Sequence, residues 1–250
     1  MEVSHLTPHT SHLTPMINWL IQSTTDLPAL PAEAWLAPPE RERLAALRVE
    51  KKRREWLLGR WTAKRLAQAV LAQEGHGQVE LADLVITPAP DGAPELVVGG
   101  HPASLILYPS ISHSGGRAFC ALGPGCVAVG ADIEGIAPRG EGFAEDYFTA
   151  GERALVAAAP AARRDALVTA IWSAKEAALK ALRLGLTVDT RLVECLVPPF
   201  GGAAPETWAP FTASCHPSLG VAPATMRCWW RADDQTVLTL AALGPGATTV

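Results

Sequence analysis

The sequence predicts an α+β protein built from two halves of similar pattern. In each half, helical segments are followed by short segments of strand character with turn residues between them, which is typical of antiparallel sheets packed with helices. Apolar residues make up 48% of the 250 positions, enough for a sizeable core. A Gly-Pro-Gly segment at 123–125 marks the expected boundary, so we expect lobes at 16–124 and 125–250.

The first half is predicted to combine two helices with several strands. A helix at 40–49 follows two prolines, and a longer one at 51–73 ends near Gly75. Apolar side chains recur at helical spacing in the longer helix, at Trp56, Leu57, Trp61, Leu66 and Val70. The predicted extended segments are 17–21, 79–86, 105–111 and 118–122. The last of these flanks Gly-Pro-Gly together with 127–133, and the two are expected to form a hairpin.

The second half follows the same order. A helix is expected to begin after Thr149, whose side chain caps it in concert with Glu152 three residues on. Whether Glu152 also acts as a base stays open. A long helix at 165–184 comes next, followed by strands at 188–196 and 207–214 and a final hairpin of 226–230 with 236–243.

The first fifteen residues repeat Ser-His-Leu-Thr-Pro twice, and the Thr-Pro pairs disfavour regular structure. We therefore expect residues 1–15 to be a disordered extension, and whether they are native stays open. They contain no Lys or Arg that would mark a secretion signal. The longest apolar stretch, 118–131, is interrupted by Gly-Pro-Gly and is too short for a membrane span, so a cytoplasmic location is expected.

The cysteines indicate reduced, mostly buried thiols. There are five and no Cys-x-x-Cys pair, a pattern that signals neither a zinc site nor a disulfide framework. They are Cys120, Cys126, Cys195, Cys215 and Cys228.

Charge is unevenly distributed along a chain whose formal net charge is −4. Residues 41–65 hold ten of the 21 Lys and Arg against three Glu. Such a block attracts anions or an acidic partner, and the alternative is a solvated helix face. Nucleic acid is a poor candidate for the anion, because the whole chain is not basic and shows no interleaving of aromatic and basic residues.

Two acidic segments point to metal and phosphate chemistry. Asp132 and Glu134 end a strand and share one of its faces. Glu176 and Lys180 lie one turn apart on the later helix. Three carboxylates are suited to Mg²⁺, which proteins bind through a few carboxylates together with substrate phosphate, and the lysine is suited to that phosphate. The alternative is a plain strand end and a solvated helix face.

Together these segments resemble the signature of the 4'-phosphopantetheinyl transferases, of the larger, surfactin-synthetase-activating (Sfp) type. Residues 130–134 match its G-x-D-x-E strand end, and 172–180 match its W-[ST]-x-K-E-[AS]-x-x-K helix. Residues 111–115 are similar to its serine-histidine turn, and 53–60 to its basic helix that ends in Leu-Gly-Arg. The resemblance covers roughly 36–243.

The resemblance implies a monomer of two similar, pseudo-dimeric lobes with the active site between them. It implies transfer of 4'-phosphopantetheine from coenzyme A to a serine of an apo carrier protein, the activity of a holo-[acyl-carrier-protein] synthase, with adenosine 3',5'-bisphosphate as the other product. Mg²⁺ is the implied cofactor. The carrier, which could belong to fatty-acid, polyketide or nonribosomal peptide synthesis, stays open.

The resemblance also assigns roles to residues. Asp132, Glu134 and Glu176 would be the metal ligands, with Asp132, Glu176 and Lys180 as the catalytic residues. Glu176, directly or through a water on the metal, would accept the proton of the serine, and Lys180 would hold the diphosphate. The residues that would bind the rest of coenzyme A are Ser112 and His113, at its phosphates, and Arg53 and Arg60, near the 3'-phosphate and adenosine.

The chain departs from the family pattern at one position. The family commonly has a lysine or arginine between the glycine and the proline that precede the serine-histidine turn, whereas this chain has Ala93 between Gly92 and Pro94. One phosphate contact is therefore in question, unless a neighbouring basic residue replaces it.

Two other functions stay open beside the transferase. One is a non-catalytic relative that binds coenzyme A or a carrier protein. The absence of a basic residue at position 93, where the chain has Ala93, favours this alternative. The other is a different Mg²⁺-dependent phosphate enzyme, such as a phosphatase. A serine hydrolase fits poorly, because the sequence contains no G-x-S-x-G elbow.

Overall fold

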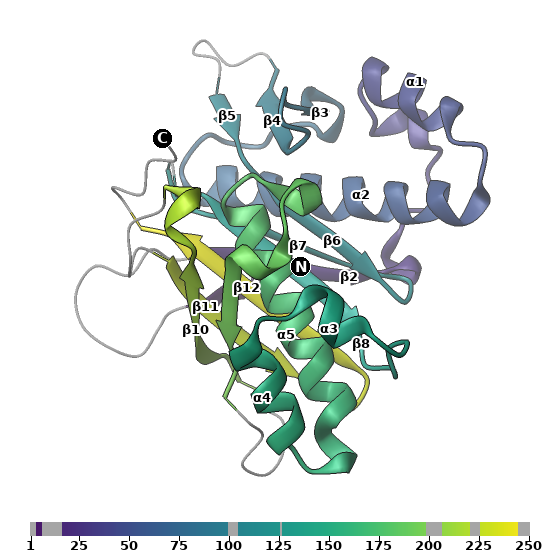
Figure 1. The fold of residues 1–250 in the computed structure, drawn as a ribbon. Coiled ribbons are helices and arrows are strands. Elements are labelled where there is room, and N and C mark those ends of the chain that lie inside the picture. The colour runs from purple at the N-terminus through teal and green to yellow at the C-terminus, as the bar shows by residue number, and fades with distance from the viewer. Residues whose placement is uncertain are drawn as a thin grey trace. The chain divides into compact units, whose positions relative to one another are not determined.

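The computed structural model of the chain describes residues 4–6, 17–99, 105–125, 127–198, 207–220 and 226–244. They belong to two compact units, Met1–Cys126 and Val127–Val250. Each unit combines helices with small antiparallel sheets, so the predicted α+β class is confirmed (Figure 1). No helix in these ranges is apolar over enough residues to cross a membrane.

The first unit contains two sheets and two principal helices. A four-stranded sheet has the order β1-β2-β7-β6, and a three-stranded sheet has the order β3-β4-β5. Its strands are β1 (Ser4–Leu6), β2 (Ile17–Ser23), β3 (Leu84–Pro88), β4 (Pro94–Val98), β5 (Leu105–Leu107), β6 (Ser110–Ser114) and β7 (Arg117–Leu122). Its helices are α1 (Pro38–Ala46) and α2 (Glu50–Gln73).

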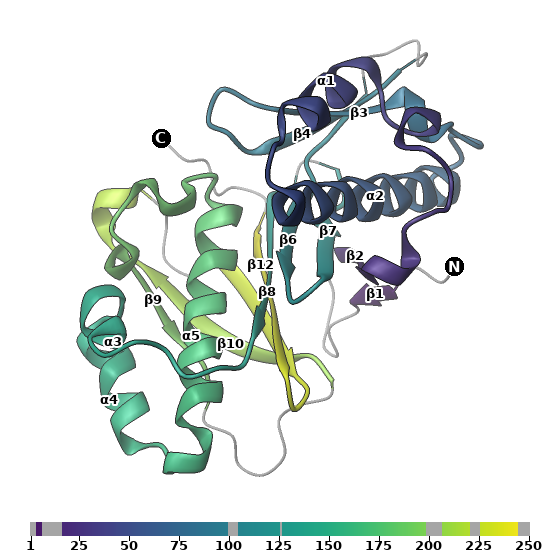
Figure 2. The ribbon, with the colours of Figure 1, turned by 90° about the vertical axis from the view of Figure 1, so that its right-hand side faces the viewer.

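Helix α2 is the centre of this unit. It lies between the two sheets (Figures 1 and 2), and one core cluster joins Leu66 and Leu71 of α2 to Leu96 of β4 and Cys120 of β7. Its N-terminal half packs against the segment that leads into α1, where the rings of Trp35 and Trp61 meet edge to face at 5.2 Å. The predicted apolar stripe therefore fixes α2 in place, and its basic residues, apart from the buried Lys64, lie on the remaining faces.

The second unit contains one five-stranded antiparallel sheet of order β8-β12-β11-β10-β9. Its strands are β8 (Val129–Gly135), β9 (Val193–Leu196), β10 (Ala209–Cys215), β11 (Met226–Ala232) and β12 (Thr236–Leu243). Its helices are α3 (Phe143–Tyr147), α4 (Ala150–Ala158) and α5 (Ala161–Ala181). Figure 2 shows α5 along one face of the sheet, and its Ala-rich surface forms the core of the unit with β9, β11 and β12.

The final hairpin is confirmed as β11 and β12, but the hairpin predicted across Gly-Pro-Gly is wrong. In the described part of the chain, β7 pairs with β2 and β6, and β8 pairs with β12. The turn residues at 123–125 connect two sheets rather than two neighbouring strands, because each strand pairs with other strands of its own unit. Of residues 1–15, expected to be disordered, the structure describes only β1, which pairs with β2.

Two predicted strands are shorter than expected. A 3-10 helix, Leu81–Asp83, precedes β3, and another, Thr190–Leu192, precedes β9. In the second case the carboxylate of Asp189 accepts a hydrogen bond from the backbone N–H of Arg191 and so caps the turn. Local side-chain hydrogen bonds of this kind compete with extended structure at strand ends.

Four cysteine side chains are described, and all carry free thiols. Cys120, Cys195 and Cys228 are buried, and Cys215 is partly buried. Burial raises the pKa of the Cys195 thiol well above its ordinary value, which makes it a poor nucleophile. Cys126 lies outside the described residues.

A close approach of helix and strand determines where the acidic residues of the second unit meet. Helix α5 lies so near β8 that a Cβ atom added to Gly130 would stand 1.7 Å from the carbonyl oxygen of Ala177. Only glycine therefore fits at this position of the strand. The absence of a side chain at Gly130 lets α5 bring its acidic turn down onto the strand.

Gly130→Ala is therefore expected to destabilise the protein by about 1–3 kcal/mol or more, because backbone must move to make room. Urea denaturation followed by tryptophan fluorescence measures this loss. Gly140→Ala is the matched control, since Gly140 is exposed and a Cβ there has no atom within 4 Å. Equal stability of the two variants would contradict the packing argument.

Candidate functional site

Strand β8 and helix α5 together carry an acidic cluster, which we define as Asp132, Glu134, Glu176 and Lys180. In the ladder of β8 with β12, Asp132 lies opposite Thr239 and Glu134 opposite Val237. Alternation along the strand places both carboxylates on the same face. A hydrogen bond from Ser173 of α5 to Asp132 identifies this as the face that α5 covers. The predicted convergence of the two segments is therefore present in the structure.

Asp132 is held at both of its carboxylate oxygens. Its side chain is buried, and its Oδ2 accepts a hydrogen bond of 2.7 Å from Ser173 Oγ. Its Oδ1 accepts one of 2.7 Å from Lys180 Nζ. Thr239 supports the serine, since its hydroxyl lies 2.9 Å from Ser173 Oγ and donates to the Ser173 carbonyl at 2.8 Å. The orientation of this buried carboxylate is thus fixed by residues of α5 and β12.

Lys180 is the cation of the acidic cluster. Its Nζ lies 3.7 Å from Glu176 Oε2, so the predicted position of the two side chains on one helical face is confirmed. It also donates to the Ala131 carbonyl at 3.2 Å. Burial disfavours the charged form, but the carboxylates of Asp132, Glu176 and Glu134 outweigh it and raise the Lys180 pKa above its ordinary value. The ammonium therefore stays protonated at neutral pH.

The two glutamates carry carboxylates with raised pKa values. For Glu134, burial and the charge of Asp132 raise the pKa, against hydrogen bonds from Arg139 (3.0 Å) and Trp172. For Glu176, burial raises the pKa, Lys180 lowers it, and the charges of Asp132 and Glu134 raise it further. Both glutamates thus feel the negative charge of Asp132, and Glu176 also feels that of Glu134, which is the electrostatic condition that a bound cation relieves.

The donor chemistry of the acidic cluster fits a hard divalent cation, because it consists of carboxylate oxygens on two adjoining elements. Among the described residues, however, no three or more His, Cys, Asp or Glu side chains are arranged to hold a metal ion. Lys180 Nζ forms an ion pair with Asp132 Oδ1, at 2.7 Å. A cation at Asp132 therefore competes with Lys180 for this oxygen.

Glu152 of α4 and Lys175 of α5 form a second charged pair, which is wholly buried. Their Nζ and Oε2 atoms lie 2.9 Å apart, and both side chains have 0% exposure. Lys175 also donates to the carbonyls of Thr190 and Val193. Glu152 accepts hydrogen bonds from the backbone N–H groups of Thr149 and Cys195, which confirms the predicted capping box. With its oxygens engaged in this way, Glu152 anchors α4 to α5.

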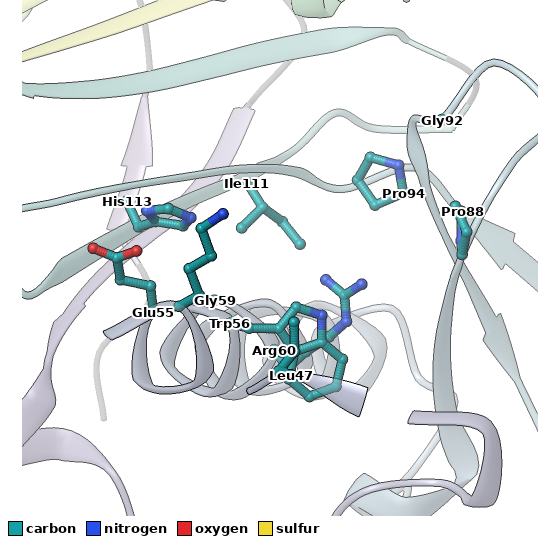
Figure 3. A pocket seen from close by; sticks show the side chains of 11 residues that line it. Leu47, Glu55, Trp56, Gly59, Arg60, Pro88, Gly92, Pro94, Ile111 and His113 are labelled. Atoms are coloured by element: carbon teal, nitrogen blue, oxygen red, sulfur yellow. The ribbon is translucent and has the colours of Figure 1, made fainter. Parts of the chain in front are cut away.

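The first unit contains a pocket of about 470 Å³, which we call the basic pocket (Figure 3). Helix α2 contributes Trp56 and Arg60 to it, and β6 contributes Ile111 and His113. Its complete lining is Leu47, Lys52, Glu55, Trp56, Gly59, Arg60, Pro88, Gly92, Pro94, Ile111 and His113. Apolar walls with a few cationic groups suit an anionic ligand that also has an apolar part.

Arg60 is oriented from two sides within the basic pocket. Its Nε lies 3.8 Å from the buried carboxylate of Glu40, and its guanidinium lies over the Trp56 ring, 4.9 Å from the centroid. The same carboxylate pairs with the fully buried ammonium of Lys64. Because Glu40 is already neutralised by Lys64, the charge of Arg60 stays available to a ligand.

The structure brings some of the predicted coenzyme A ligands together and not others. Arg60 and His113 both line the basic pocket. Arg53 is not in its lining, and its guanidinium donates instead to the carbonyl of Leu44 at 2.9 Å, which joins α2 to the end of α1. Ser112 is buried on β6, where alternation directs it away from the face of Ile111 and His113.

Several contributors to these sites were not singled out from the sequence. Ser173 lies inside the helical signature and fixes Asp132, but a serine there carries no separate signal. Thr239 lies 66 positions from Ser173, and only the β8–β12 register reveals it. In the first unit, Lys52 and Trp56 are ordinary members of a basic amphipathic helix until the basic pocket is seen.

Residues 128–237 match the family model of the 4'-phosphopantetheinyl transferase superfamily. The matched segment is less than half of the chain and lies within the second unit, around the acidic cluster. It supports transfer of phosphopantetheine as the general activity. The superfamily uses coenzyme A, typically with a divalent metal ion, and acts on carrier proteins. None of the curated proteins matches the chain.

Proposed function

We propose that this protein transfers the 4'-phosphopantetheine group of coenzyme A to a serine of an apo acyl, peptidyl or polyketide carrier protein. The products are the holo carrier and adenosine 3',5'-bisphosphate. The observation that carries the proposal is the acidic cluster, which combines three carboxylates with a protonated lysine inside the matched segment. The similarity of 53–60 and 111–115 to the larger Sfp-type enzymes supports that type.

In this reaction the serine oxygen forms a bond to the phosphorus that bears pantetheine, and the bond from that phosphorus to the nucleotide's bridging oxygen breaks. Asp132, Glu134 and Glu176 are the residues that would hold Mg²⁺, which when bound neutralises charge on the diphosphate oxygens. Transfer of a phosphoryl-type group depends mainly on such neutralisation and on alignment, so no covalent protein intermediate is needed.

Proton transfer and leaving-group stabilisation fall to two residues of α5. We assign the proton of the incoming serine to the Glu176 carboxylate, a group that can act as a general base. Lys180 keeps its proton throughout and places a positive charge where the departing nucleotide gains negative charge. Ser173 and Thr239 keep Asp132 in a fixed orientation during the reaction.

The basic pocket is assigned to the adenosine and the 3'-phosphate of coenzyme A. Arg60 and His113 supply the cationic and polar groups, and Trp56 supplies an aromatic wall. These parts of coenzyme A do not react, so their binding free energy serves to orient the diphosphate.

Arg60→Ala is accordingly expected to raise the KM for coenzyme A by roughly tenfold or more while lowering kcat less, because a charged hydrogen-bonding partner of the substrate is lost. Steady-state kinetics with coenzyme A and with 3'-dephospho-coenzyme A measure the effect, and the dephospho substrate should be nearly insensitive. Arg54→Ala is the control, since Arg54 is exposed, pairs with Glu50 and is not among the lining residues. Equal KM values for the two variants would contradict the assignment of the basic pocket.

Analysis of the nucleotide products separates this proposal from its alternatives. Adenosine 3',5'-bisphosphate that forms only when an apo carrier is present supports the transferase. Release of inorganic phosphate from coenzyme A would indicate a phosphatase. Binding of coenzyme A without any product would indicate a non-catalytic relative, the alternative that the alanine at position 93 favours.

A further inference from the structure

Helix α2 carries seven basic side chains, and within the described residues six of them have partners. The six are Lys51 with Glu55, Arg53 with the Leu44 carbonyl, Arg54 with Glu50, Arg60 and Lys64 with Glu40, and Arg65 with Gln68. The seventh, Lys52, is exposed and makes no hydrogen bond or ion pair within the described ranges. Among the described residues, Lys52 is therefore the basic side chain of α2 without a polar partner.

Lys52 lines the basic pocket, where a second element lacks a cation. The turn between β3 and β4 contributes Gly92 to the lining, and β4 contributes its first residue, Pro94, with Ala93 between them. The backbone N–H of Ala93 donates to Asp91 Oδ1 at 3.0 Å, which holds the turn in shape. The turn thus approaches a ligand in the basic pocket through backbone and small side chains, without a charge of its own.

The charges around the basic pocket favour an anion. Glu55 is the acidic side chain in the lining, and Lys51 lies 3.9 Å from its carboxylate. Glu40, next to Arg60, is neutralised by Lys64. Lys52 and Arg60 therefore remain as positive charges for a ligand, from positions two helical turns apart along α2. A phosphate monoester, which carries up to two negative charges, matches two such cations.

We propose that Lys52 binds the 3'-phosphate of coenzyme A and so replaces the cation that is absent at Ala93. The inference rests on the proposed function, which assigns the diphosphate to the acidic cluster and leaves the 3'-phosphate as the remaining phosphate of coenzyme A. Lys52 and Arg60 then act together, with Arg60 held rigidly by Glu40 and Trp56 and Lys52 free to move onto the phosphate.

Binding calorimetry on the full chain tests this inference. For Lys52→Ala the Kd for coenzyme A should rise about tenfold through loss of a charged contact, and the Kd for 3'-dephospho-coenzyme A should change less than about twofold. Arg54→Ala removes one exposed positive charge from the same helix outside the basic pocket and should leave both Kd values unchanged. This control separates a specific contact from a general loss of positive charge.

A second variant tests the replacement itself. Adding Ala93→Lys to Lys52→Ala supplies a cation from the turn and should return the Kd for coenzyme A to within about threefold of the unsubstituted protein. Failure of this rescue overturns the replacement. The proposed contact of Lys52 with the 3'-phosphate is overturned if the Lys52→Ala protein binds coenzyme A normally. It is also overturned if this protein loses affinity equally for coenzyme A and 3'-dephospho-coenzyme A. Either result holds even if the protein still transfers phosphopantetheine. An unsubstituted protein that binds no coenzyme A overturns the proposed function as well.

Discussion

Glu176→Gln is expected to lower kcat for carrier modification by at least about a hundredfold, the scale of losing a general base. Glutamine preserves the size of the side chain and an oxygen that can still accept from Lys180, but it cannot take up the serine proton. Turnover assays with a fixed apo carrier and saturating coenzyme A measure the change.

Glu145→Gln is the control for this effect, because Glu145 is an exposed acidic residue of α3 in the same unit. It should retain normal turnover. Asp132→Ala is expected to match the loss at Glu176, since it removes the best-fixed carboxylate of the acidic cluster. Near-normal turnover of a folded Asp132→Ala protein would refute the assignment of this residue to metal binding.

Glu152→Ala is expected to destabilise the second unit by about 3–5 kcal/mol, the cost of leaving a buried charge without its partner. The ammonium of Lys175 has 0% exposure and would keep only the carbonyls of Thr190 and Val193. The backbone N–H groups of Thr149 and Cys195 would also lose their acceptor. Chemical denaturation of the purified protein measures the loss of unfolding free energy.

A double variant separates the effect of the buried Lys175 charge from the effect of the backbone hydrogen bonds to Glu152. Glu152→Gln with Lys175→Met keeps an acceptor oxygen for one of the two backbone N–H groups and removes the buried ammonium, so it should be more stable than Glu152→Ala. Glu145→Ala should lie within about 0.5 kcal/mol of the native protein, as surface changes usually do. If the Glu152→Ala protein unfolded at the same urea concentration as the unsubstituted protein, the Glu152–Lys175 pair would not anchor α4 to α5.

The sequence predicts the elements whose signals are local. The apolar stripe of α2, the Thr149 capping box and the β11–β12 hairpin all depend on residues close to one another in the sequence, and each is confirmed. The hairpin predicted at Gly-Pro-Gly is wrong because strand pairing is settled by distant partners. Strand β7 pairs with β2 from the start of the chain, and β8 with β12 from its end.

The candidate site also contains features that local sequence signals predict and features that depend on distant partners. Helical spacing places Glu176 beside Lys180, and strand alternation places Asp132 on the face of Glu134. That the two segments meet was expected from the family resemblance, and the contacts of Lys180 with Asp132 and Glu176 confirm it. Spacing and alternation could not show that Lys175, one residue before Glu176, faces the core and pairs with Glu152, because both faces of an Ala-rich helix look alike in sequence. The residues that support the acidic cluster from other elements, such as Thr239, depend on sheet register and emerge only from the fold.

Intact mass of an apo carrier protein after incubation with this protein, coenzyme A and Mg²⁺ tests the proposed activity most directly. A gain of about 340 Da, the phosphopantetheine group attached to the serine nucleophile, is the predicted result. The gain should disappear with EDTA and with a carrier whose acceptor serine is replaced by alanine. An unchanged mass across acyl, peptidyl and polyketide carriers, under conditions in which the protein binds coenzyme A, would contradict the transferase assignment.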